Sequence, residues 1–179
     1  MKRVIGILRA GGVGVLATDT LYGVVAPALD RATVERVYQL KHRRPSKPCI
    51  ILIGRYEDLA GFGIEPTAEL RQQLSAYWPG PVSVILPCPR ADLAYLHRGT
   101  RSLAFRLPGK PALRRFLRQA GPLIAPSANP EGLPPAATLA EARAYFGDAV
   151  DFYRRGRTST RASKLIQIAE TGHITVLRD

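Results

Sequence analysis

The stretch that decides the fold is "KHRRPSKPCIILI", residues 41–53, which joins a helix to a strand. Val34, Val37 and Tyr38 mark the buried face of a helix that we expect over 31–42. Pro45 disfavours helical geometry at the residue before it, so this helix should end near His42. The apolar run that follows predicts a buried strand over 49–53.

The same alternation continues along the chain and predicts an α/β fold with a twisted mixed sheet. Residues 17–24, "ATDTLYGV", look like a strand-to-helix turn. Thr138 and Glu141 have capping-box spacing at a helix start. Expected strands are 13–17, 49–53, 82–86, 103–106, 123–125, 164–168 and 174–177. Expected helices are 2–10, 31–42, 67–77, 111–120 and 138–146.

The composition limits the class of protein. The chain has 179 residues, of which 46% are hydrophobic, and this suits one domain over 1–179. Lys and Arg number 26 against 14 Asp and Glu, so the net charge of +12 predicts a polyanionic partner such as a nucleotide, an RNA or an acidic membrane.

Cysteine spacing and hydropathy predict the compartment. Cys49 and Cys88 lie outside any CxxC spacing, which argues against a disulfide framework and a zinc site and fits a reducing cytoplasm. No apolar run approaches the ~18 residues of a membrane span. Arg9 interrupts the N-terminal apolar stretch before it reaches the length that a signal peptide needs. We therefore expect a cytoplasmic protein without membrane contact.

The basic residues of the opening stretch are candidates for an anion site. In an extended exit from the helix, Lys41 and Arg43 would share one side of the chain, and Lys47 would be brought close to the buried strand. Lysine supplies a compact charge, and arginine a planar fork that grips phosphate or carboxylate. A solvated basic loop is the alternative at this point.

Two polar stretches accompany the basic one. Residues 17–24 carry Thr20 next to aromatic and glycine residues, and residues 125–132, "APSANPEG", carry Ser127 and Asn129 after an expected strand. Small polar side chains in such places hold ligand oxygens, but they also cap turns and helices. Each stretch by itself therefore leaves both readings open.

Together these motifs resemble a known family. "TDTLYG", "KHRRPSKP", "WPGPVSVIL", "SLAFRLPGKP" and "PSAN..G" occur in the order and spacing of the YrdC/TsaC family, over essentially the whole chain. The resemblance implies a YrdC-like domain over 1–179 and a nucleotidyltransferase, threonylcarbamoyl-AMP synthase. That enzyme joins ATP, L-threonine and bicarbonate into threonylcarbamoyl-AMP and pyrophosphate, for the tRNA modification threonylcarbamoyladenosine.

The resemblance also implies roles for individual residues. Lys41 and Arg43 correspond to the KxR signature and are the expected catalytic residues, while Ser127 and Asn129 correspond to the SxN signature. The expected ATP-binding residues are Arg43, Lys47, Ser102, Ser127, Asn129 and Arg178. The expected threonine-binding residues are Thr20, Tyr22, Arg106 and Ser163.

Four positions depart from the family pattern. Lys164 replaces a threonine, Ala17 a common proline, Leu52 a histidine of some members, and Glu131 a serine that often follows the SAN. The effect of these departures is left open.

The implied chemistry needs no covalent nucleophile, and the sequence offers none. It has no Ser-His-Asp spacing, GxSxG or Walker A motif, and its histidines lack metal-ligand spacing. We therefore expect no protein-held metal, ATP as a substrate, and Mg²⁺ carried by the ATP. Expected partners are L-threonine, bicarbonate, ATP and the proteins that transfer the threonylcarbamoyl group onward.

The main alternative is a non-catalytic module that binds double-stranded RNA or tRNA. The net positive charge permits phosphate contacts, but the sequence shows no RRM, KH or zinc-knuckle signature. A carbamoyl-transfer domain like the one inside hydrogenase maturation proteins is a further alternative, disfavoured because no acylphosphatase-like or zinc-finger segment accompanies it. Direct contact with tRNA is left open.

Overall fold

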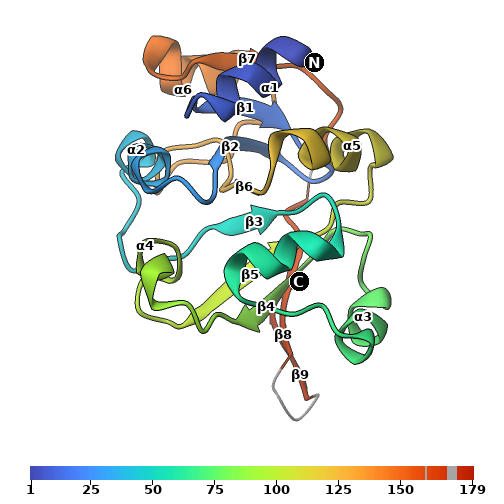
Figure 1. Ribbon diagram of the computed structural model, residues 1–179. Coiled ribbons are helices and arrows are strands. Elements are labelled where there is room, and N and C mark those ends of the chain that lie inside the picture. The colour runs from blue at the N-terminus through green and yellow to red at the C-terminus, as the bar shows by residue number, and fades with distance from the viewer. Residues whose placement is uncertain (160, 169–172) are drawn as a thin grey trace.

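The strands of the described chain form one mixed sheet (Figure 1). The structure is a computed structural model and describes residues 1–159, 161–168 and 173–179. Within these residues the strand order is β7-β1-β2-β6-β3-β5-β4-β8-β9. The strands are β1 (Gly14–Ala17), β2 (Tyr22–Pro27), β3 (Ile50–Leu52), β4 (Val82–Pro87), β5 (Ser102–Arg106), β6 (Leu123–Ile124), β7 (Phe152–Arg154), β8 (Lys164–Ile168) and β9 (Ile174–Arg178).

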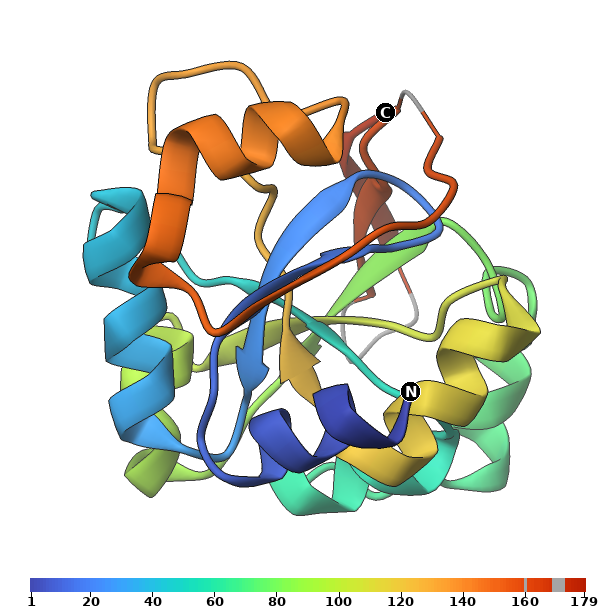
Figure 2. The same cartoon turned by 90° about the horizontal axis from the view of Figure 1, so that it is seen from above.

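The sheet mixes the two pairing directions, as expected. Strands pair in parallel at β1–β7, β3–β5 and β4–β8. The pairs β1–β2, β2–β6, β3–β6, β4–β5 and β8–β9 are antiparallel. Seen from above, the strand direction turns along the sheet (Figure 2). The expected mixed α/β fold is therefore confirmed.

The helices flank this sheet, and the five expected ones lie close to their predicted positions, whereas the short helix α4 (Ala94–His97) was not expected. Thr138 Oγ1 accepts from Glu141 N (3.1 Å) and donates to Glu141 Oε1 (3.0 Å), so the expected capping pair is present. In the described ranges, no helix combines the length and apolarity needed to cross a membrane. The helices are α1 (Lys2–Arg9), α2 (Arg31–Lys41), α3 (Ala68–Ser75), α4 (Ala94–His97), α5 (Pro111–Ala120) and α6 (Leu139–Phe146), with 3₁₀ turns η1 (Tyr56–Phe62), η2 (Ala91–Leu93) and η3 (Gly147–Ala149).

An apolar core covers each face of the sheet. In β2, Val24 belongs to the larger cluster, together with Val37 of α2, and Val25 belongs to the smaller one. Leu8 of α1 and Leu117 of α5 also belong to the smaller cluster, where these two helices pack side by side (Figure 2). All five side chains are fully buried. Each contributes about 1.5–3 kcal/mol to the free energy of unfolding, which makes the sheet a rigid frame.

Residues 17–24 form a β-hairpin, so the expected strand-to-helix turn is wrong. Thr18 N (3.1 Å) and Thr18 Oγ1 (2.6 Å) both donate to Leu21 O and close a tight turn between β1 and β2. β2 was not expected, because most of it is buried on both faces and shows no polar alternation. β7 was also missed, since it has only three residues.

Helix α2 ends where expected, but not through an extended exit. His42 adopts a left-handed conformation (φ 49°, ψ 38°), and Arg43 N donates to Tyr38 O (3.0 Å). Lys41 is therefore still helical and buried, while Arg43 already belongs to the following loop. The expected extended exit from the helix is therefore wrong, because the chain reverses at His42, although Lys41 and Arg43 still lie close enough for Arg43 to lower the pKa of Lys41.

The connection from β7 to β8 crosses the molecule. β7 pairs with β1 at one edge of the sheet, whereas β8 pairs with β4 near the other. Side chains from other elements hold the first part of this connection: Tyr22 Oη donates to Gly156 O (3.0 Å), and Lys110 Nζ donates to Arg157 O. A Cβ at Gly156 would lie 2.8 Å from Cβ of Ala17, so glycine permits this close approach.

Candidate active site

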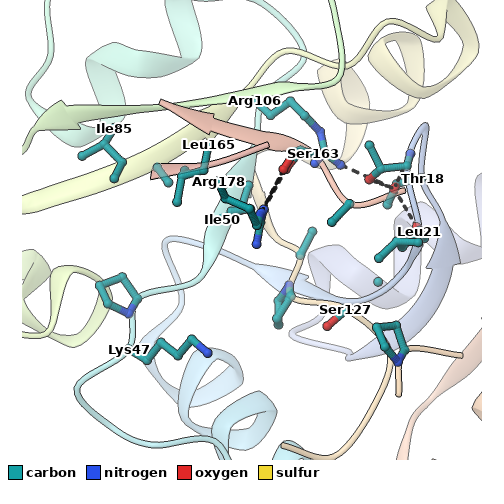
Figure 3. Close-up of a pocket in the computed structure, with 18 of the residues that line it drawn as sticks. Thr18, Leu21, Lys47, Ile50, Ile85, Arg106, Ser127, Ser163, Leu165 and Arg178 are labelled. Carbon is teal, nitrogen blue, oxygen red and sulfur yellow. Dashed lines mark hydrogen bonds between the residues drawn. The ribbon is translucent and has the colours of Figure 1, made fainter. Parts of the chain in front are cut away.

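A cavity of about 480 Å³ opens where the loops around the sheet meet (Figure 3). Its volume falls within the range of small-molecule pockets, roughly 300–1,000 Å³. It brings together residues from the hairpin turn, the loops after α2 and β6, and strands β5, β8 and β9. The expected site residues that line it are Thr20, Tyr22, Arg43, Lys47, Ser102, Arg106, Ser127, Ser163 and Arg178.

Lys41 and Asn129 do not line the cavity but stand behind one of its walls, where both bond to the lining residue Ser127. Lys41 Nζ donates to Ser127 O (2.5 Å) and to Asn129 O. Ser127 Oγ donates to Asn129 Oδ1 (2.6 Å), and Asn129 Nδ2 donates to Leu133 O (2.6 Å). These bonds fix the loop that presents Ser127 to the cavity. Direct ligand contacts of Lys41 and Asn129 stay a prediction.

Lys41 is a buried cation whose partners are mostly backbone oxygens. Lys41 is only 2% exposed, and its side chain lies near that of Arg43. Burial, followed by repulsion from Arg43, lowers the pKa of Lys41 to about 8. Charged Lys41 is thus held at a cost to the folded state, because it has left water without a carboxylate in contact.

This cost predicts a pH dependence of stability. The folded state releases the Lys41 proton near pH 8, and the unfolded state only near the ordinary 10.5, so stability should rise with pH between these values. Relative to Lys41→Met, the wild type should gain about 1–2 kcal/mol of unfolding free energy between pH 7 and pH 9.5. Urea unfolding at both pH values measures this gain, with exposed Lys2→Met as the control; a pH-independent difference would contradict it.

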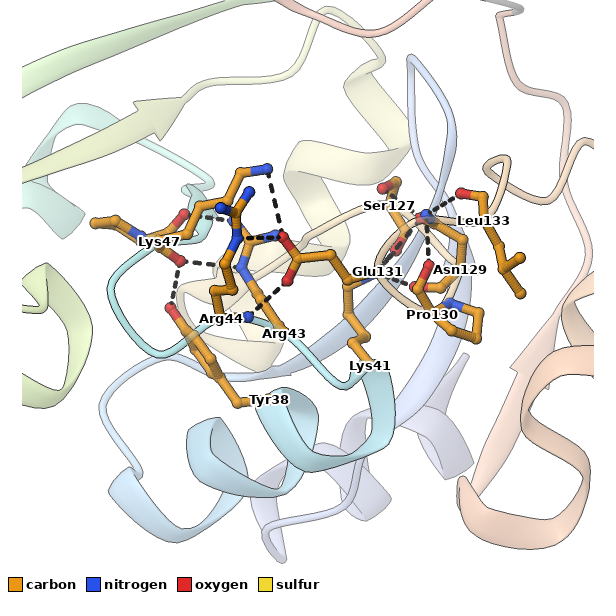
Figure 4. Close-up of polar contacts among 11 residues, drawn as sticks. Tyr38, Lys41, Arg43, Arg44, Lys47, Ser127, Asn129, Pro130, Glu131 and Leu133 are labelled. Atoms are coloured by element: carbon orange, nitrogen blue, oxygen red, sulfur yellow. Dashed lines mark hydrogen bonds and ion pairs between the residues drawn. The ribbon is translucent and has the colours of Figure 1, made fainter.

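The basic loop, residues 43–48, keeps its shape through internal hydrogen bonds (Figure 4). Lys47 O accepts from Tyr38 Oη (2.8 Å) and from Arg43 Nε (3.0 Å), and Arg43 Nη2 donates to Pro48 O (2.8 Å). The Lys47 side chain is 56% exposed and lines the cavity. The backbone of the loop is therefore anchored and holds its cations beside the cavity. This arrangement argues against a freely solvated basic loop.

Arg106 forms a buried ion pair at another side of the cavity. Its Nη2 lies 3.2 Å from Asp19 Oδ1, and both side chains are less than a tenth exposed. Gly109 N donates to Asp19 Oδ2 (3.1 Å). Burial lowers the pKa of Arg106, and Asp19 opposes this shift. Arg106 Nε is a buried donor that has no partner among the described residues.

Ser163 and Arg178 form a third part of the wall. Arg178 Nη2 donates to Ser163 O (2.8 Å) and to Ser163 Oγ (3.2 Å), and Arg178 Nε donates to Ser163 O (3.1 Å). Ser163 Oγ also lies 2.9 Å from Ser83 Oγ of β4. Burial lowers the pKa of Arg178. Arg178 therefore both lines the cavity and holds Ser163 in place.

Between these polar groups the wall is apolar. Ile50 of β3, Ile85 of β4 and Leu165 of β8 line it together with Pro48. Such a surface suits a flat ring or an alkyl group rather than a charge. The cavity thus offers both a cationic and an apolar environment to one ligand.

Three residues that support the site were missed from the sequence. Asp19 pairs with Arg106, Ser83 contacts Ser163, and Lys110 Nζ donates to Thr18 O (2.8 Å). Asp19 had a usable signal, because an acidic residue inside a hydroxyl-rich turn of a strongly basic chain is a candidate partner for a buried arginine. Ser83 and Lys110 had none, since only the pairing of distant strands and loops brings them to the site.

The described residues offer no metal centre. Within residues 1–159, 161–168 and 173–179, no three or more His, Cys, Asp or Glu side chains cluster so that they could hold a metal ion. Delivery of Mg²⁺ on ATP stays a prediction.

Known proteins resemble this chain in fold and in sequence. The family model Sua5_yciO_yrdC, described as "Telomere recombination", matches residues 6–179. A threonylcarbamoyl-AMP synthase of Nitrosococcus oceani is 35% identical over 158 residues, 87% of this chain and 85% of the relative. A threonylcarbamoyl-AMP synthase of Hahella chejuensis is 29% identical over 179 residues, 99% of this chain and 97% of the relative.

A solved structure agrees with these sequence matches. The crystal structure of P. abyssi Sua5 complexed with L-threonine superposes with a TM-score of 0.88 at 27% identity, covering 99% of this chain and 53% of that one. This chain thus spans about half the length of P. abyssi Sua5. The resemblance to the YrdC/TsaC family is confirmed. Because the family model matches nearly all residues, and a relative above 30% identity covers most of both chains, this chain belongs to the Sua5/YciO/YrdC family.

Proposed function

We propose that this chain is a threonylcarbamoyl-AMP synthase, which joins ATP, L-threonine and bicarbonate into threonylcarbamoyl-AMP and pyrophosphate. The observation that carries the proposal is the cavity, where the buried donor Arg106 Nε and the cation Lys47 lie on opposite sides (Figure 3). Relatives with the name threonylcarbamoyl-AMP synthase support it. The product would serve threonylcarbamoyladenosine formation in tRNA through downstream transfer proteins, from a single YrdC-like domain over 1–179 in the cytoplasm.

L-Threonine binds on the Arg106 side. The guanidinium of Arg106 receives the threonine carboxylate, because its Nε is buried and lacks a partner among the described residues. Thr20, Tyr22 and Ser163 supply hydroxyls in the same part of the wall. The structure of P. abyssi Sua5 complexed with L-threonine supports threonine as a ligand, while its position beside Arg106 rests on the geometry of this chain alone.

ATP binds on the side of the basic loop. Arg43, Lys47 and Arg178 face its phosphates, and the hydroxyls of Ser102 and Ser127 donate to them or to the ribose. The apolar wall formed by Pro48, Ile50, Ile85 and Leu165 receives the adenine ring. Mg²⁺ arrives with the ATP.

The reaction brings two anions together. The threonine amine attacks the carbon of bicarbonate, a carbamate forms and water leaves. A carbamate oxygen then attacks the α-phosphorus, and the bond to pyrophosphate breaks. Cations fixed in advance offset the repulsion between carbamate and triphosphate and stabilise the charge that develops on the transferring phosphate.

Lys41 acts in this scheme as a positioning residue. Its Nζ is occupied by Ser127 O and Asn129 O, behind the wall of the cavity. Asn129 in turn accepts a hydrogen bond from Ser127 Oγ. Both residues therefore shape the Ser127 loop, and Arg43 is the member of the KxR signature that faces the ligand.

Mass spectrometry tests the proposed function directly. Purified protein incubated with ATP, Mg²⁺, L-threonine and bicarbonate, without tRNA, should produce threonylcarbamoyl-AMP or its breakdown products together with pyrophosphate. Omission of bicarbonate should abolish the product. Absence of any adenylate, combined with tRNA binding that weakens steeply with salt, would favour the RNA-binding alternative instead.

A further inference from the structure

Each cation that lines the cavity already has partners inside the protein. Arg43 and Arg178 donate to backbone oxygens, Arg106 pairs with Asp19, and Lys47 Nζ lies 3.9 Å from Glu131 Oε1. The two ion pairs differ in exposure. The Arg106–Asp19 pair is buried, whereas the side chains of Lys47 and Glu131 are 56% and 22% exposed. A ligand from solvent can therefore displace only the second pair easily.

Glu131 has three contacts with the chain around the basic loop (Figure 4). Its Oε2 accepts from Arg44 N (2.6 Å), its Oε1 lies 3.2 Å from Arg44 Nε, and the same Oε1 faces Lys47 Nζ. The bond from Arg44 N is the largest cause that keeps the pKa of Glu131 below its ordinary value. Glu131 is thus a fixed negative charge beside a cation of the proposed phosphate site.

The loop does not need this charge to keep its shape. Lys47 O is held by Tyr38 Oη and Arg43 Nε, and Glu131 N donates to Lys41 O (2.7 Å) through backbone atoms alone. Of the two bonds from Arg44, the one from its backbone N requires only an acceptor oxygen at position 131, and the one from its Nε belongs to a side chain that is 76% exposed. A glutamine would supply that oxygen without the charge, so the electrostatic effect of Glu131 can be separated from its structural effect.

We propose that Glu131 is an internal counter-anion that competes with the ligand's phosphates for Lys47 and thereby sets the affinity of the site for polyanions. In the empty site Glu131 holds Lys47 beside the cavity. When a polyphosphate enters, Lys47 turns from the carboxylate to the phosphate, while the backbone of the basic loop stays in place. The inference deepens the proposed nucleotide site and rests on it.

Removal of this competitor should strengthen phosphate binding. Glu131→Gln should lower the Kd for inorganic tripolyphosphate and for ATP by about threefold to tenfold at low salt, the range expected for one partly exposed charge near a charged ligand. The gain should shrink as KCl is added, because salt screens exposed charges. Glu65→Gln, an exposed substitution outside the cavity lining, changes the net charge equally and should leave both Kd values unchanged.

Isothermal titration calorimetry in a Lys47→Met background completes the experiment. If Glu131 acts through Lys47, the gain from Glu131→Gln should fall below about twofold there. An equal gain in both backgrounds would overturn the proposal in favour of a diffuse charge effect. Weaker binding by Glu131→Gln in otherwise wild-type protein would overturn it in favour of a structural role.

The tripolyphosphate titration also separates this inference from the proposed function. It reports on the phosphate site whether or not the protein makes an adenylate. A failed synthesis assay with the expected tripolyphosphate result would reject the function alone. A successful assay with no gain from Glu131→Gln would reject the counter-anion alone.

Discussion

Arg106→Lys should reduce kcat/KM for L-threonine by at least about 100-fold, because it removes two charge-assisted hydrogen bonds that together contribute about 3–6 kcal/mol. The substitution keeps a cation beside buried Asp19, so the ion pair that fixes this part of the wall survives. What it loses is the planar fork and, with it, the Nε donor that has no partner among the described residues.

Two controls make this result specific. Arg101→Lys applies the same change at an exposed residue that does not line the cavity, and it should leave kcat/KM unchanged. The Kd of Arg106→Lys for tripolyphosphate should also stay close to the wild-type value, because Arg106 lies apart from the basic loop (Figure 3). A loss of threonine use smaller than tenfold in folded protein would place the threonine carboxylate elsewhere.

Arg43→Lys should lower kcat/KM for ATP by about 10- to 150-fold, the equivalent of one charge-assisted hydrogen bond worth roughly 1.5–3 kcal/mol. Arg43 uses two different nitrogens to hold Lys47 O and Pro48 O while it lines the cavity. A single ammonium cannot reproduce that fork, so a ligand contact or a loop contact must be lost.

Arg44→Lys provides the matched comparison one residue away. The Arg44 side chain is 76% exposed, and its backbone N–H keeps its bond to Glu131 whatever the side chain. Its effect on kcat/KM for ATP should stay within about twofold, as for most exposed ion pairs. Equal small effects of both substitutions, in protein shown to be folded by circular dichroism, would mean that the basic loop is solvated and that the site lies elsewhere.

The sequence predicted the strands and helices whose signal is local. The expected strand over 164–168 and the expected helix over 111–120 coincide with β8 and α5. β2 was not predicted, because burial on both faces removes the alternation of polar and apolar residues that marks a strand. β7 was not predicted, because three residues are too few to show a strand pattern and because its pairing with β1 joins distant parts of the chain. Local patterns thus predict elements but not their long-range partners.

The same distinction applies to the site. Motif resemblance named nine of the residues that line the cavity, Arg43 and Ser127 among them, but not its apolar wall. It did not predict that Lys41 stands behind the wall, because nothing in the residues "KHRRP" indicates the left-handed turn at His42. It also did not predict the ion pair between Glu131 and Lys47, since that pair depends on the approach of two loops.

The connection from β7 to β8 affects when a newly made chain can first bind its ligands. Contacts that close the cavity join residues 80 positions apart at Ser83–Ser163 and 134 apart at Tyr22–Gly156. Such contacts form late in folding, because long loops must close first. Translation supplies Arg178 after every other residue that lines the cavity, so the binding wall is incomplete until β9 has been made. Ligand binding at the complete wall therefore begins only once β9 has paired with β8.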